Sequence, residues 1–175
     1  MAAALQRRAR LRLVPDDAAV DAMAARIREM KPIDRLRAQQ FNVLGTIATI
    51  REFGVPFVLT GAVAALLQGF PTPIEDVRIL VHDTDAAMGA LERLLLAEQL
   101  LFREFGPDEL RAIVQRSWAI VDCDVQITLV DELPDSLTVE LMTDFEVRVL
   151  PPEALLADEE VASMLGVVQV PSSES

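Results

Sequence analysis

The sequence predicts an α/β protein of the two-layer α+β kind, in which helices pack on one mixed sheet of about five strands. Apolar residues recur at helical spacing over residues 16–53, which indicates an N-terminal helical hairpin. From residue 55 onward, short segments of strand length alternate with turns and with one long helical segment. With 51% apolar and 25% charged residues, the 175-residue chain has a globular composition and fits one domain.

Two predicted helices make up the N-terminal hairpin, residues 16–54. The first spans 16–30, begins with two aspartates that favour a helix N-terminus, and ends before a proline. The second is expected over about 33–53, with Gly54 as a typical stop. Their apolar stripes are typical of a core, so we interpret both helices as scaffold.

The main domain is expected over residues 55–166. Its first part reads as a buried strand (VPFVLT, 55–60), a short helix opened by Gly61 and closed by Gly69, and a strand over 76–82. The further predicted elements are a helix over 84–102 capped by Thr84 or Asp85, an alternating strand over 119–130, a hairpin of 137–141 with 145–150, and a helix over 151–165. Residues 167–175 are expected to be a disordered tail.

The charge of the chain limits its partners. The formal net charge is −12, although residues 1–12 carry four arginines and no acid, which leaves 12 basic and 28 acidic side chains in the rest. Because an acidic body repels nucleic-acid phosphates, we expect a protein partner or a homo-oligomer, and no nucleic acid. Residues 1–15 are expected to form a flexible basic arm, with a targeting presequence as the alternative.

Single residues exclude several kinds of chemistry. Cys123 is the only cysteine, so the chain forms no internal disulfide and no cysteine cluster for a metal, which favours a cytoplasmic setting. His82 is the only histidine and is expected at the surface, while Trp118 is expected to pack in the core or at its edge. No apolar run reaches the roughly 18 residues that a membrane span needs, so the chain is expected to be soluble.

Three acids stand out on the predicted strands. Asp76 begins one strand, and Asp122 and Asp124 share one face of a later strand. If the two strands are neighbours, these carboxylates converge, as magnesium-dependent phosphoryl or nucleotidyl transfer requires. Acids at strand ends are also commonly solvated, and spacing alone leaves both interpretations open.

The stretch VLTGAVAALLQGFPTPIEDVRILV (58–81) resembles the opening of the nucleotidyltransferase fold in the DNA polymerase β-like superfamily. It is most similar to the minimal bacterial and AbiEii-like toxin branches. In that family a strand ends in a Gly-Gly or Gly-Ser pair that starts a short helix, a glycine closes the helix, and the next strand carries an Asp-x-Asp pair. The resemblance covers about residues 41–165, since the later helix, the acid-bearing strand and VRVLPPEALLADEE also stand where the family has counterparts.

The glycine motif is matched in part. Gly61 corresponds to the first glycine of the pair, whereas Ala62 stands where a second glycine or a serine is usual. Ala62 offers no hydroxyl and adds a methyl group where a phosphate would pass. Gly69 corresponds to the closing glycine, and Gln68 takes a place that is often His or Tyr.

The acid motif departs further from the family. Asp76 corresponds to the first acid of Asp-x-Asp, Arg78 replaces the second, and Asp122 or Asp124 is the candidate for the third. The lysine of the later family helix is absent, with residues 157–158 in its neighbourhood. Our hypothesis is that Arg78 occupies the place of the metal and bridges Asp76 to Asp122 or Asp124, since guanidinium fits carboxylates bidentately. The resemblance then implies an inactive homologue without a cofactor, acting as a binding, regulatory or assembly subunit, for example an antitoxin.

Three alternatives stay open. The chain could be an active, magnesium-dependent nucleotidyltransferase that moves NMP from an NTP to RNA, protein or a small molecule. Asp76, Asp122 and Asp124 would then hold the metal, and Gly61, Ala62 and Arg78 would contact the nucleotide. Alternatively, Arg78 is an ordinary surface arginine, or the motif match is accidental and the chain is an unrelated α/β scaffold.

Overall fold

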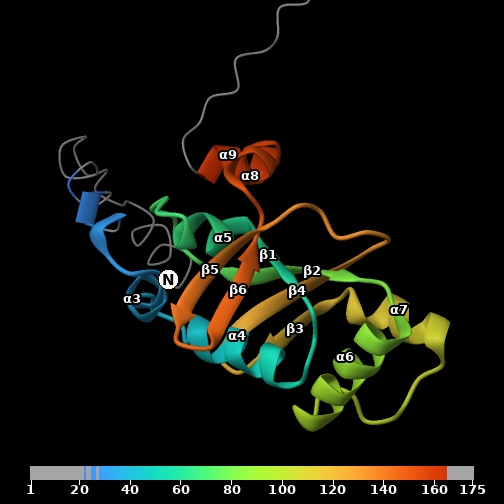
Figure 1. Cartoon of the computed structure of the whole chain (residues 1–175). Coiled ribbons are helices and arrows are strands. Elements are labelled where there is room, and N and C mark those ends of the chain that lie inside the picture. Colours follow the sequence, from blue (N-terminus) through green and yellow to red (C-terminus); the bar gives the residue numbers. More distant parts are fainter. Residues whose placement is uncertain (1–21, 23–24, 27, 165–175) are drawn as a thin grey trace, which may run out of the picture.

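The computed structural model describes residues 22, 25–26 and 28–164 (Figure 1). It confirms the predicted fold class, a mixed sheet with helices packed on it, although the sheet has six strands rather than about five. The strands are β1 (Val58–Thr60), β2 (Asp76–His82), β3 (Ser117–Ile120), β4 (Cys123–Val130), β5 (Leu137–Met142) and β6 (Phe145–Val149). Their order across the sheet is β3-β4-β2-β1-β6-β5.

The three-residue strand β1 lies in the middle of the sheet. It is antiparallel to β2 and parallel to β6. β2 in turn is parallel to β4, and the hairpins β3–β4 and β5–β6 complete the two halves. The start of β2 and the start of β4 therefore lie side by side near the point where β1 ends.

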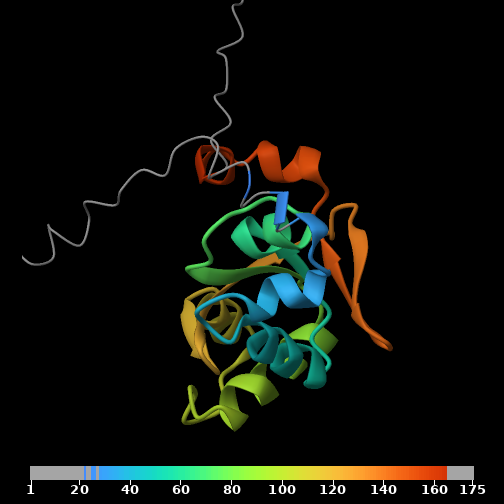
Figure 2. The same cartoon turned by 90° about the vertical axis from the view of Figure 1, so that its left-hand side faces the viewer.

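The described helices are α3 (Pro32–Arg37), α4 (Val43–Glu52), α5 (Gly61–Leu67), α6 (Asp85–Ala97), α7 (Pro107–Val114), α8 (Pro152–Leu156) and α9 (Glu159–Met164). In Figures 1 and 2, α4 and α6 lie below the sheet, whereas α8 and α9 lie at the opposite end of the molecule. β2 buries Val77, Ile79 and Val81 by strand alternation. α5 is made of small and aliphatic residues and is buried along its whole length, so it belongs to the core.

The N-terminal helical region differs from the prediction. The helix expected over 33–53 is two helices, because Asn42 caps α4: its side chain accepts a hydrogen bond of 2.9 Å from the main-chain N–H of Gly45. The main-chain N–H of Asn42 donates to a carboxylate oxygen of Asp122 at 2.9 Å instead of continuing the helix. The helix expected over 16–30 lies largely outside the described residues, as do the arm of residues 1–15 and the tail of 167–175.

The strand expected over 119–130 is also wrong as a single element. It is the hairpin of β3 and β4, in which Ile120 pairs with Cys123 and residues 121–122 form the tip. Val121 has a φ of 57° and is 51% exposed, so it is a turn residue and not part of the core. The expected burial of Cys123, by contrast, is confirmed.

Helix ends account for the remaining differences. α6 begins as predicted, since Thr84 accepts a hydrogen bond from the N–H of Ala87, but it ends at Ala97 and not near residue 102. Gln99 adopts a φ of 59°, and the N–H of Leu100 donates back to Leu95, which closes the helix.

The C-terminal elements follow the prediction in part. The predicted hairpin of 137–141 with 145–150 is confirmed by the pairing of β5 with β6. The helix expected over 151–165 is divided into α8 and α9 at residues 157–158. None of the helices in the described part of the chain is long and apolar enough to cross a bilayer.

Candidate functional site

Asp76 and Arg78 form an ion pair at the start of β2. The Nε of Arg78 lies 3.3 Å from Oδ1 and 3.2 Å from Oδ2 of Asp76. The contact follows from strand geometry, because residues two apart point to the same face. The side chain of Arg78 is 25% exposed and that of Asp76 is 18% exposed, so the pair is mostly shielded from water. The Asp76–Arg78 contact of the predicted bridge is therefore present, whereas the bridge from Arg78 to Asp122 or Asp124 stays a prediction.

The first turn of α5 packs against the aliphatic part of Arg78. Thr60, the last residue of β1, pairs with Arg78, and Gly61 then turns the chain into α5 with a φ of 66°. A Cβ at Gly61 would lie 3.2 Å from Cδ of Arg78, and Ala62 next to it is buried. Gly61 and Ala62, which the resemblance assigns to nucleotide binding together with Arg78, therefore lie in the turn that packs against Arg78.

Asp124 is the second carboxylate of this site. Its Cα is the register partner of the Cα of Asp76 on the neighbouring parallel strand, so both side chains leave the same face of the sheet. Asp124 is exposed, and Gln126 occupies the corresponding place opposite Arg78. Gln126 was not among the predicted site residues, although the alternation over 119–130 places it on the face of Asp124.

Asp122 does not belong to this group. It lies at the tip of the β3–β4 hairpin, and its carboxylate accepts the hydrogen bond of Asn42 at the start of α4. Of the two candidates for a third acid, only Asp124 shares a strand face with Asp76. Among the described residues, no group of three His, Cys, Asp or Glu side chains is placed to hold a metal ion.

Gln68 also has a structural role in the described part of the fold. Its Nε2 donates to the main-chain carbonyl of Leu150 at 2.7 Å and to that of Ala64 at 3.1 Å. The residue that stands where the family often has His or Tyr thus ties the end of α5 to the end of β6.

A second arginine–carboxylate contact lies at the other end of β2. Nε of Arg111, on α7, lies 2.8 Å from Oδ1 of Asp83, and its Nη2 lies 3.4 Å from Asp85. The hydrogen bond to Asp83 raises the pKa of Arg111. This contact joins α7 to the loop that follows β2, and we interpret it as a structural clamp.

The arrangement at the start of β2 defines a class of site, a carboxylate held by an internal guanidinium with a second, exposed carboxylate one strand away. Comparisons with protein-family models, with curated proteins and with solved structures gave no match for this chain. The resemblance to DNA polymerase β-like nucleotidyltransferases therefore stays a prediction from motifs.

Proposed function

We propose that this chain acts by binding, as a nucleotidyltransferase-like protein in which an internal ion pair replaces the metal site. The observation that carries the proposal is the contact of Arg78 with both carboxylate oxygens of Asp76. At about 4 Å and an effective dielectric constant of about 20, a unit charge contributes about 4 kcal/mol. The arginine therefore attracts the carboxylate and repels Mg²⁺ from the place where a second acidic ligand would be needed.

The partner that we propose is a protein or a second copy of this chain, met in the cytoplasm, with this chain as its regulatory or assembly subunit. The net charge of −12 supports a protein partner with a basic or mixed-charge surface, because an acidic surface associates fastest with such a surface and repels phosphate chains. An antitoxin-like role is one form of such a subunit.

A second candidate function is favoured by the register of the strands. Since Asp76 and Asp124 are direct partners on β2 and β4, two carboxylates are available on one face. A magnesium ion held by them and by substrate phosphates would suit transfer of NMP from an NTP to RNA, protein or a small molecule. Arg78 would then turn to a nucleotide phosphate, beside the main chain of Gly61 and Ala62.

Thermal melting with Mn²⁺ or Mg²⁺ and each NTP separates the two functions. The native chain, Arg78→Asp and the double variant Arg78→Asp/Asp124→Asn are compared, with Arg93→Asp on the exposed side of α6 as a control for the charge change. Under the binding proposal the native chain and the control show no shift, whereas Arg78→Asp gains one that Asp124→Asn removes. A ligand at 100 times its Kd adds about 2.7 kcal/mol, roughly 5–11 °C for a domain of this size.

Two results would contradict the binding proposal. A metal-dependent shift of the native chain, together with transfer of label from a radiolabelled NTP, would establish the second candidate. If neither the native chain nor Arg78→Asp responds, the Asp76–Arg78 pair does not replace a metal site, and the nucleotidyltransferase-like interpretation fails.

A further inference from the structure

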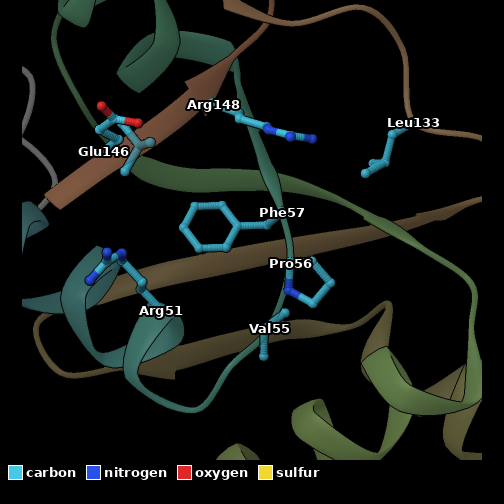
Figure 3. A pocket seen from close by; sticks show the side chains of 8 residues that line it. Arg51, Val55, Pro56, Phe57, Leu133, Glu146 and Arg148 are labelled. Carbon is cyan, nitrogen blue, oxygen red and sulfur yellow. The ribbon is translucent and has the colours of Figure 1, made fainter. Parts of the chain in front are cut away.

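A hollow of about 300 Å³ lies at the opposite end of β1 from Asp76 and Arg78 (Figure 3). Its walls come from the last turn of α4, from the segment 55–57 that leads into β1, and from β6. Nothing in the proposed function uses it.

The hollow exists because β1 begins only at Val58, so the residues before it do not pair with β6. The register between β1 and β6 starts at Val58 and Arg148, so Glu146 has no partner in β1. The segment before Val58 contains Pro56, which has no main-chain N–H to extend the pairing. The chain therefore leaves a gap beside β6 whose floor is the ring of Phe57, a residue packed against the core from its other side.

Two arginines flank this apolar floor, and Figure 3 shows them on opposite sides of the Phe57 ring. Arg51 is held in place, because its Nη2 donates to the main-chain carbonyl of Asp144 at 2.8 Å and its Cζ lies 4.7 Å from the centre of the Phe145 ring. Arg148 is exposed and forms no ion pair within the described part of the chain.

Glu146 is the third charged side chain of the hollow. It also forms no ion pair within the residues that the structure describes, so neither arginine is neutralised there. The hollow thus carries an excess of one positive charge in a chain with a net charge of −12. An excess positive charge over an aromatic floor favours an anion with an apolar body.

The geometry points to a binding site for small monoanions with an apolar body, above all arylalkanoic acids. The carboxylate would bind the guanidinium of Arg148, which presents two parallel N–H donors. The aromatic body would lie on Phe57, in the hollow that Pro56 and Leu133 also line. Glu146 disfavours a second negative charge, so a monocarboxylate is preferred over a phosphate monoester, and the volume suits a ligand of this size.

Phenylacetate is the probe, and it is titrated into the full chain while amide NMR spectra are recorded. Neutral phenylacetamide has the same shape and tests the charge, and phenyl phosphate tests the preference for a monoanion. We expect saturable shifts confined to β6, the end of α4 and segment 55–57, with phenylacetamide at least about tenfold weaker, as for a lost charged hydrogen bond.

Variants test the named residues. Arg148→Met should weaken phenylacetate about tenfold. Arg116→Met, at an exposed arginine beside the far edge strand β3, should bind like the native chain. Glu146→Gln should strengthen phenyl phosphate more than phenylacetate, because it removes the carboxylate that repels the second charge.

Three outcomes would overturn the inference. These are the absence of saturable shifts at any soluble concentration, equal binding of phenylacetamide and phenylacetate, and an Arg148→Met variant with native affinity. The amide spectra of each variant also report whether the fold is retained. If Arg148→Met is misfolded, Arg148→Lys replaces it, since it keeps the charge but loses the two parallel donors, and it should bind more weakly than the native chain.

Discussion

Two glycines with positive φ make the packing at the candidate site measurable. Gly61 has a φ of 66° and Gly54 a φ of 78°, so alanine is strained at both positions. They differ in their surroundings: a Cβ at Gly61 would lie 3.2 Å from Cδ of Arg78, whereas a Cβ at Gly54 meets nothing within 4 Å. Gly54→Ala therefore reports the backbone strain alone, and Gly61→Ala adds the contact with the arginine.

The left-handed conformation costs an alanine about 1–2 kcal/mol. We expect Gly54→Ala to lower the free energy of unfolding by this amount. Gly61→Ala should cost about 1 kcal/mol more, because the side chain of Arg78 must shift or the turn must move. A loss of 1 kcal/mol corresponds to roughly 2–4 °C in Tm for a domain of this size.

Urea denaturation of both variants, alone and combined with Arg78→Ala, provides the assay. Removal of Cγ and Cδ leaves only Cβ of Arg78, which lies 3.6 Å from the added methyl group, an ordinary contact distance. The extra cost of Gly61→Ala should then disappear, whereas Gly54→Ala should be unaffected. Equal costs of the two alanines in the native background, or an excess that persists without the arginine side chain, would show that Arg78 does not restrict the space beside Gly61.

Three more predictions concern residues outside the ion pair. Asp122→Ala should cost about 1 kcal/mol in urea denaturation, because it removes the hydrogen bond at the start of α4, while Asp124→Ala at an exposed position should change stability by less than about 0.5 kcal/mol. Arg35→Met should lower the free energy of unfolding by about 1.5–3 kcal/mol, since the buried Nη1 donates to a main-chain carbonyl at the end of α5 at 2.7 Å. Arg37→Met, at a side chain that is 59% exposed, should lower it by less than about 1 kcal/mol. Equal losses in the two variants would contradict this prediction. Burial raises the pKa of the Cys123 thiol, so this thiol ionises at lower pH in the unfolded chain than in the folded chain. The native chain should therefore lose stability relative to Cys123→Ala as the pH rises above about 8.5. Parallel denaturation curves of the two proteins at several pH values would show or exclude this loss.

The contact at the candidate site could be predicted from the sequence because it is local. Asp76 and Arg78 are two residues apart on a strand, and the alternation of VRILV fixes their common face. The turn at Gly61 could also be predicted from the sequence, since a strand followed by glycine and small residues is typical of a tight turn into a buried helix. Both features depend on fewer than about ten residues of sequence.

The place of Asp122 could not be predicted in this way. The alternation of Val121 with Cys123 continues through the hairpin tip, and a two-residue turn usually carries Gly, Asn or Asp at the position that Val121 occupies. The tip of the β3–β4 hairpin also accepts the hydrogen bond that the main-chain N–H of Asn42 donates to Asp122, and this contact depends on the tertiary structure. The end of α6 at Gln99, which has a positive φ, could not be predicted either, because the sequence has no glycine there.

The distance in sequence between β1 and β6 leaves one edge of β1 unpaired while the chain is being synthesised. β1 pairs with β2 at once, but its other edge waits for Arg148 and Val149 of β6, about ninety residues further along. During that interval of synthesis, the middle strand of the future sheet presents an unpaired edge of apolar residues, a surface on which other chains aggregate. A nascent chain halted before residue 148 should therefore bind holdase chaperones, and release should follow once β6 is available.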